Sequence, residues 1–119
     1  MSPQLLVADI DRSIEFYTKK LGFGIDFRYE DFYSGISKDG FSIHLKVGKP
    51  SIEDRRKRRN KQDLDIVFSV DGIEDLYEEI SGKSLDLIQP MRKMDYGKEF
   101  YVADPDGYII AFLEETTSL

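Results

Sequence analysis

The sequence contains no cysteine and no tryptophan among its 119 residues, and only one histidine. Without cysteine there can be no disulfide, thiol nucleophile or thiolate metal ligand, so any chemistry must come from oxygen and imidazole groups. No apolar run approaches the roughly 20 residues that a membrane-spanning helix needs, and no secretory signal pattern stands at the N-terminus. We therefore expect a cytoplasmic protein without a membrane anchor.

Charge is unevenly distributed along the chain. The net charge of −6 disfavours a general nucleic-acid surface. Residues 55–59 are all basic, and Lys61 follows them. This cluster could contact phosphate or an acidic partner, or it could be a solvated linker. No aromatic residue, of the kind that stacks on bases, lies between Pro50 and Val67, so the sequence favours the linker.

The chain repeats itself. Residues 7–17, VADIDRSIEFY, are echoed by residues 70–77, VDGIEDLY, and residues 38–45, KDGFSIHL, are echoed by residues 105–112, PDGYIIAF. Each half alone is too small to bury a stable core, so the repeat predicts two modules within one domain. We expect residues 1–119 to form that single domain, with module 1 at about 1–48, a linker at 49–62 and module 2 at about 63–119.

Each half shows the same order of elements. Apolar residues at helical spacing after a short strand predict a helix that Gly22 ends in the first half and Gly82 ends in the second. Asp71 and Glu74 have capping-box spacing at the start of the second helix. Pro90 predicts an edge strand or a bend. The expected strands are residues 3–8, 25–29, 32–37, 41–47, 64–70, 85–91, 99–103 and 108–113.

Two segments resemble the glyoxalase, bleomycin-resistance and extradiol-dioxygenase superfamily. They are LVADIDRSIEFYTKKLGF, residues 6–23, and GKEFYVADPDGY, residues 97–108. The resemblance runs over nearly the whole chain and implies an α+β fold. In that fold two tandem βαβββ modules form an open, curved mixed sheet, with the helices outside and the ligand on the concave face. It also implies a homodimer.

Side-chain alternation assigns residues of each strand to one face of the sheet. In residues 41–47 the apolar side chains Phe41, Ile43, Leu45 and Val47 should pack under the helix, so His44 should point into the cavity. Similar alternation sends Ile66, Phe68, Phe100 and Phe112 to the helix side. The residues expected to face the cavity in the second half include Asp65, Val67, Ser69, Glu99, Tyr101, Ala103, Ile109, Ala111 and Leu113.

The resemblance also implies where a metal would be held. Metal enzymes of the superfamily take ligands from four cavity-facing strand positions, which here are Ser2, His44, Asp65 and Ala111. A methyl group has no lone pair, a hydroxyl is a weak ligand, and a catalytic divalent site needs about three protein ligands. We therefore expect no metal cofactor and no enzymatic activity. The alternative is a lyase, isomerase or transferase holding Ni, Zn, Mn or Fe through His44, Asp65 and Glu99.

Six side chains are candidates for ligand binding, and each has a structural alternative. His44 could contact the ligand, or it could form hydrogen bonds only with neighbouring strands. The carboxylates of Asp65 and Glu99 could recognise a cation or a hydrogen-bond donor, or form an internal pair such as Glu99 with Lys46 or Arg28. The aromatic candidates could stack on a ligand or belong to the core or a dimer contact; they are Tyr33, Tyr96 and Tyr101.

The sequence thus predicts a metal-independent protein of the bleomycin-resistance type. It would sequester a small organic molecule, cationic or aromatic, in an aromatic and acidic cleft. Close bleomycin binders of the superfamily often carry a tryptophan where Tyr96 stands, so bleomycin is not singled out as the ligand. A third reading is a domain that acts through its dimer surface alone.

Overall fold

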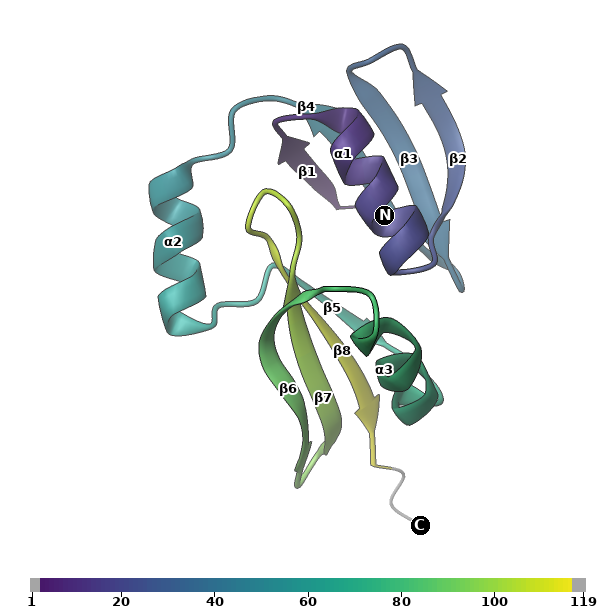
Figure 1. Ribbon diagram of the computed structural model, residues 1–119, viewed down its shortest axis with the longest axis vertical. Helices are drawn as coiled ribbons and strands as arrows, with labels where there is room; N and C mark the ends of the chain where they lie inside the picture. The colour runs from purple at the N-terminus through teal and green to yellow at the C-terminus, as the bar shows by residue number, and fades with distance from the viewer. Residues whose placement is uncertain (1–2, 117–119) are drawn as a thin grey trace. The chain divides into compact units, whose positions relative to one another are not determined.

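The computed structural model describes residues 3–116 (Figure 1). The chain divides into two compact units, with the boundary between Ile52 and Glu53. Each unit contains one four-stranded mixed sheet and is described by itself. Ser2, which the sequence placed at a metal-ligand position, lies outside the described residues.

The first unit begins with β1 (Gln4–Val7), followed by α1 (Ile10–Glu15) and a π-helical continuation, η1 (Phe16–Lys20). Three strands complete it: β2 (Gly24–Tyr29), β3 (Tyr33–Lys38) and β4 (Phe41–Val47). The strand order is β1-β4-β3-β2, with β1 parallel to β4 and the other pairs antiparallel. This is the βαβββ module that the sequence predicted.

Local sequence explains where α1 begins and which way it faces. The Asp9 carboxylate caps the helix by accepting the backbone N–H of Arg12 at 3.1 Å. Ile10 and Ile14, four residues apart on one side of the helix, are buried, as is Tyr17 in η1. Figure 1 shows α1 lying across one face of the sheet.

Beneath that helix, β4 alternates as predicted. Ile43 and Leu45 are fully buried, while His44 between them is only partly buried and contacts Tyr33 on β3. Val47, which was expected to pack with them, is 37% exposed because it is the last residue of the strand. The face opposite α1 therefore carries His44 and Tyr33.

The second unit repeats the module after an additional helix. α2 (Ile52–Lys61) begins at the unit boundary, and β5 (Ile66–Ser69) and α3 (Ile73–Ser81) follow it. The remaining strands are β6 (Asp86–Met94), β7 (Gly97–Ala103) and β8 (Ile109–Glu115). Their order is β5-β8-β7-β6, with β5 parallel to β8, so the topology of the first unit recurs.

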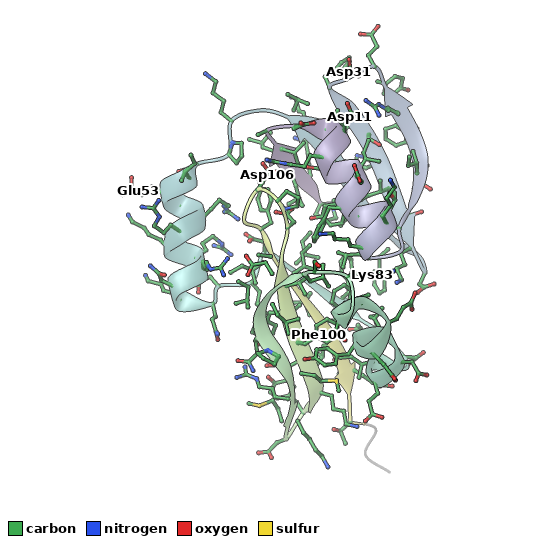
Figure 2. All side chains as sticks on the ribbon, in the orientation of Figure 1. Asp11, Asp31, Glu53, Lys83, Phe100 and Asp106 are labelled. Atoms are coloured by element: carbon green, nitrogen blue, oxygen red, sulfur yellow. The ribbon has the colours of Figure 1, made fainter. Side chains whose placement is uncertain are left out.

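The core of the second unit lies between its sheet and α3. Phe100 stacks on Phe112 with ring centroids 5.1 Å apart and meets Tyr77 of α3 at 4.9 Å. Figure 2 labels Phe100 among the side chains of this sheet. Ile66 and Phe68 of β5 are buried while Val67 and Ser69 are exposed, which confirms the predicted alternation.

The segment expected to be a linker, residues 49–62, is not an irregular loop, since α2 occupies most of it. Sequence reading missed this helix because it has no apolar stripe: no α2 residue is buried, and Ile52 is 75% exposed. What attaches α2 to its unit is charge. Arg55 and Arg58 pair with Asp65, and Arg59 pairs with Asp86 of β6.

The start of α3 differs from the predicted capping box. Gly72 is the N-cap residue, with a left-handed φ of 71° and no side-chain cap. The backbone N–H groups of Gly72 and Ile73 instead donate to the Glu114 carboxylate, at 3.1 Å each. The end at Gly82 is as predicted. Pro90 lies on β6, an edge strand with a register shift nearby, which also agrees with expectation.

The described helices include none that could cross a membrane, because none is both long and apolar enough.

Candidate functional site

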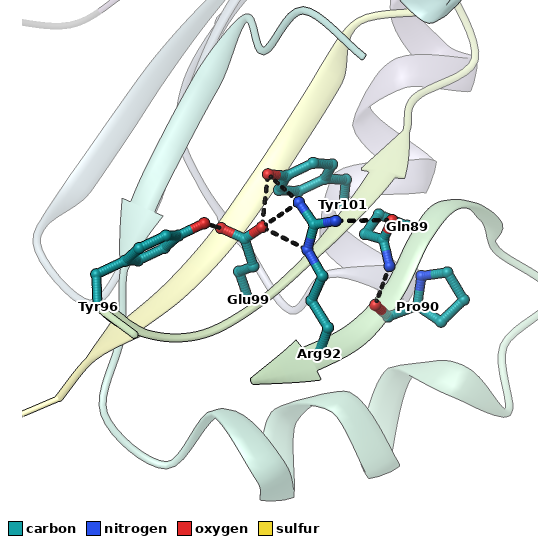
Figure 3. Close-up of polar contacts among 6 residues, drawn as sticks. All are labelled: Gln89, Pro90, Arg92, Tyr96, Glu99 and Tyr101. Carbon is teal, nitrogen blue, oxygen red and sulfur yellow. Dashed lines mark hydrogen bonds and ion pairs between the residues drawn. The ribbon is translucent and has the colours of Figure 1, made fainter. Parts of the chain in front are cut away.

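A tyrosine–glutamate cluster occupies the β6–β7 hairpin of the second unit (Figure 3). The name denotes Glu99 with Arg92, Tyr96, Tyr101 and Gln89. β6 and β7 are antiparallel, and Arg92 is the direct cross-strand partner of Glu99, so their side chains share one face. Tyr101 is two residues beyond Glu99 on β7 and therefore points the same way.

Glu99 receives hydrogen bonds on both carboxylate oxygens. Its Oε1 accepts the hydroxyl of Tyr96 at 2.5 Å. Its Oε2 accepts the hydroxyl of Tyr101 at 2.7 Å and Nε of Arg92 at 2.8 Å. Nη2 of Arg92 also pairs with Oε2 at 2.6 Å. The side chain of Glu99 is only 6% exposed, so these donors replace the water that a carboxylate needs.

Arg92 connects the rest of the cluster. Its Nη2 donates to the Tyr101 hydroxyl at 3.3 Å, and its guanidinium carbon lies 5.6 Å from the centre of the Tyr101 ring. Nη1 donates to Oε1 of Gln89 at 3.4 Å. The Gln89 amide nitrogen donates to the carbonyl of Pro90 at 2.9 Å, which fixes the direction of its oxygen.

These contacts change the protonation behaviour of the cluster. Burial alone would raise the pKa of Glu99, but the hydrogen bonds from Tyr96, Tyr101 and Arg92 outweigh burial and hold that pKa below its ordinary value. The hydrogen bond to Glu99 raises the pKa of Tyr96. Burial, followed by the same carboxylate, raises the pKa of Tyr101. Glu99 is therefore a carboxylate, and both tyrosines keep their protons, at neutral pH.

The sequence found the members of this cluster except for Arg92 and Gln89. An internal pair was one alternative given for Glu99, with Lys46 or Arg28 as examples of the partner; Glu99 instead pairs with Arg92, and Arg28 pairs with Asp11 and Asp31 in the first unit. The sequence contains a signal for the partner Arg92, because a hairpin turn between Met94 and Gly97 places Arg92 opposite Glu99.

Asp65 does not present a free carboxylate. Its Oδ2 pairs with Arg55 at 2.8 Å and accepts the backbone N–H of Ile109 at 2.8 Å. Its Oδ1 pairs with Nε of Arg58 at 2.9 Å, and the side chain is 11% exposed. Arg55 also lies over the ring of Tyr108 at 4.4 Å. The sequence left two alternatives for Asp65, recognition of a ligand and an internal pair, and the structure shows the internal pair.

The first unit carries an aromatic surface on the face opposite α1. This aromatic surface consists of Phe27, Tyr29, Tyr33 and His44. The Tyr33 hydroxyl lies 2.8 Å from Nδ1 of His44. The Phe27 ring is stacked on Tyr33, with centroids 5.9 Å apart, and meets His44 edge-on at 5.3 Å. Tyr29 contacts Phe27 at 5.7 Å and is 61% exposed.

An apolar cluster surrounds Ala111 on the second sheet. Tyr101, Ile109 and Ala111 are buried together, and the partly buried Leu64 and Ile88 pack against them. Ala111 itself is 2% exposed. Its methyl group is thus part of a packed surface, at one of the four positions where the resemblance placed a metal ligand.

Comparison with known proteins gives the family. The family profile described as "Glyoxalase/Bleomycin resistance protein/Dioxygenase superfamily" matches residues 2–112. The chain belongs to this superfamily. A bleomycin resistance protein of Geobacillus stearothermophilus is 30% identical to it, over an alignment covering 98% of this chain and 96% of the relative.

Solved structures of the superfamily share its fold. A bleomycin resistance determinant encoded on the transposon Tn5 has a TM-score of 0.77 and 16% identity, with 98% of each chain covered. The bleomycin-binding protein of Streptomyces verticillus, solved with copper(II)-bleomycin, has a TM-score of 0.72 and 20% identity, with 98% of this chain and 95% of that chain covered. At these identities the likeness establishes the α+β fold of tandem βαβββ modules.

The residues present do not fit the divalent metal used by enzymes of the superfamily. Among residues 3–116, no three His, Asp or Glu side chains are grouped to hold an ion. Both oxygens of Asp65 and both oxygens of Glu99 already accept hydrogen bonds or ion pairs, and a metal would have to displace arginine from Asp65 and either tyrosine or arginine from Glu99. In the alternative set of His44, Asp65 and Glu99, the two acids therefore offer a metal no free carboxylate.

The two modules of this superfamily member have diverged at matching positions. Gly35 pairs with His44 in the first sheet as Tyr101 pairs with Ala111 in the second. One cross-strand pair further along the same face, Tyr29 opposite Tyr33 in the first sheet matches Arg92 opposite Glu99 in the second. The matching pairs are His44 with Ala111, Tyr33 with Glu99, and Tyr29 with Arg92.

Proposed function

We propose that this chain binds and sequesters a small organic molecule of the antibiotic class, without a metal and without converting it chemically. The supporting observation is the bleomycin resistance protein that is 30% identical over nearly the full length of both chains. The Streptomyces verticillus relative solved with copper(II)-bleomycin supports the same class of ligand. A protein that only sequesters its ligand needs contact surfaces and no reactive group. The carboxylates of Asp65 and Glu99, which are held by neighbouring side chains, agree with this role.

Two surfaces of the chain suit such a ligand. The aromatic surface of the first unit offers Tyr29, which is 61% exposed, beside the stacked Phe27 and Tyr33. Aromatic rings of this kind hold flat ligands by stacking. In the tyrosine–glutamate cluster of the second unit, Tyr96 is 48% exposed and has its hydroxyl fixed by Glu99. That cluster would orient polar groups of the ligand.

The residues proposed to form these two surfaces are His44 and Tyr33 in the first unit and Tyr96, Tyr101 and Glu99 in the second, where Tyr96 is exposed and Glu99 acts through the groups that it holds in place. Asp65 is no longer proposed as a contact, because two arginines and a backbone N–H occupy it. The working assembly is a homodimer, as the resemblance implies, and size-exclusion chromatography with light scattering tests it.

The binding test uses thermal shift and calorimetry on protein treated with a chelator. Metal-free bleomycin, copper(II)-bleomycin and a panel of aromatic antibiotics are the ligands. A binder should raise the melting temperature by mass action, with the ligand recovered unchanged by mass spectrometry. Tyr101→Phe should weaken binding, whereas Tyr77→Phe, on α3 in the same unit, should not.

Three results would contradict the proposal. They are a panel without any binder, binding that appears only after Ni, Zn, Mn or Fe is added, and a recovered ligand with an altered mass.

A further inference from the structure

We propose that Arg92 sets the charge class of the ligand at the tyrosine–glutamate cluster: it makes this surface a donor site for a carboxylate, sulfonate or carbonyl group on an aromatic ligand and excludes a cation. This inference rests on the proposed function and deepens it. It also revises the expectation that Glu99 would recognise a cationic guest.

Exposure shows which group a ligand meets first. The side chain of Arg92 is 37% exposed, whereas that of Glu99 is 6% exposed. Arg92 and the half-exposed Tyr96 therefore form the accessible part of the cluster. An incoming group contacts a guanidinium and a phenol, while the carboxylate lies behind them.

Glu99 has little capacity left for a ligand cation. Two tyrosine hydroxyls and Nε of Arg92 already donate to its oxygens, and Nη2 of Arg92 forms an ion pair with Oε2. A cation would have to displace Arg92, which holds Glu99 with charge-assisted hydrogen bonds, and would then leave the guanidinium without its partner. The cluster therefore disfavours a positive charge although the whole chain carries −6.

Arg92 still has donor capacity. Nε and Nη2 are used by Glu99 and Tyr101. Nη1 carries two N–H groups, and its one recorded contact among the described residues is Gln89 at 3.4 Å. The remaining N–H is available to a ligand oxygen. Because Glu99, Tyr101 and Gln89 hold the guanidinium in place, binding there costs little side-chain entropy.

The test uses three naphthalene probes of one shape and different charge: 2-naphthoate, 2-naphthamide and 2-naphthylmethylammonium. Binding to the full chain is followed by ¹H–¹⁵N NMR, which detects millimolar affinity and reports the Arg92 side-chain N–H directly. We expect 2-naphthoate to bind best and the ammonium probe worst. Arg92→Gln should weaken 2-naphthoate binding by about tenfold, the value of a hydrogen bond to a charged group.

Lys93→Gln is the matched control. It makes the same change of charge one residue away on β6, where side-chain alternation points it to the other face, so any effect of net charge appears in both variants. The double variant Arg92→Gln with Glu99→Gln removes the pair together and leaves no buried charge. It should lose 2-naphthoate binding even if Arg92→Gln alone fails to fold.

The outcomes separate this inference from the proposed function. If the ammonium probe binds as well as 2-naphthoate and shifts the resonances of residues 96–99, the charge assignment is overturned while small-molecule binding stands. Equal losses in Arg92→Gln and Lys93→Gln would also overturn it. If no probe shifts any resonance of either unit, the charge assignment is overturned, and the proposed function is decided separately by the antibiotic panel.

Discussion

The ring of Phe27 lies against the backbone of Gly35, its cross-strand partner on β3. A Cβ atom at Gly35 would stand 2.2 Å from the Phe27 ring, so no other residue fits while the ring keeps its place. The aromatic surface of the first unit therefore depends on this glycine, for reasons of space rather than backbone conformation.

Gly35→Ala should displace the Phe27 ring and destabilise the fold by about 1–3 kcal/mol, as overpacking does. Urea unfolding measures the cost, and NMR of the His44 ring reports the disturbed surface. Gly24→Ala on β2 is the control, because the nearest atom to its added Cβ is 4.0 Å away. Adding Phe27→Ala to Gly35→Ala should remove the clash; equal stability loss with and without Phe27 would contradict the account.

Asp65→Asn should release α2 from the second unit. The change leaves Arg55 and Arg58 without their partner, and we expect a loss of about 1–3 kcal/mol, below the value for a fully buried pair because both arginines are partly exposed. Hydrogen exchange should accelerate across residues 52–61. Asp63→Asn, an exposed acid two residues earlier, is the control. Unchanged exchange in α2 would show that something else holds the helix.

Acid should weaken the fold through Glu99. Its pKa is lower in the folded chain than the ordinary value of about 4.3 expected when unfolded. Its contribution to stability is therefore complete above that ordinary value and is lost as pH falls through the folded pKa. Glu99→Gln should flatten stability against pH in this range, measured by urea unfolding. Glu79→Gln on the exposed side of α3 should leave the curve unchanged, and a similar effect of both variants would contradict the assignment.

Two tyrosines should titrate late in alkali. Tyr96 owes its raised pKa first to Glu99, and Tyr101 owes its raised pKa first to burial. Ultraviolet titration of Glu99→Gln should return Tyr96 most of the way to about 10 and Tyr101 only part of the way. Tyr96→Phe and Tyr101→Phe assign the two transitions. Equal recovery of both tyrosines would mean that burial is not the main cause at Tyr101.

Glu114→Gln should destabilise the start of α3. It removes the charge that accepts the N–H groups of Gly72 and Ile73, at a cost of about 1 kcal/mol. Asp71→Asn, at the position that the sequence named as the cap, should cost less. Thermal unfolding of both variants measures the two losses of stability. A larger loss for Asp71→Asn than for Glu114→Gln would favour the predicted capping box.

The parts predicted correctly from sequence depend on neighbouring residues. The burial of Ile43 and Leu45 around His44 follows from alternation along one strand, and the end of α3 at Gly82 follows from local backbone preference. The parts predicted wrongly depend on partners distant in sequence. Asp65 is paired by α2, whose charged sequence carries no apolar period, and the partner of Glu99 is set by the register of the β6–β7 hairpin.

The ion pairs of Asp65 with Arg55 and Arg58 have a consequence for redesign. Asp65 stands at a metal-ligand position of the superfamily pattern, but here it holds α2 against the sheet. The same carboxylate could not bind a metal without giving up these arginines. Placing a glutamate at Ala111 would not by itself complete a metal site, because Asp65 would first have to be released from Arg55 and Arg58 and α2 anchored in another way.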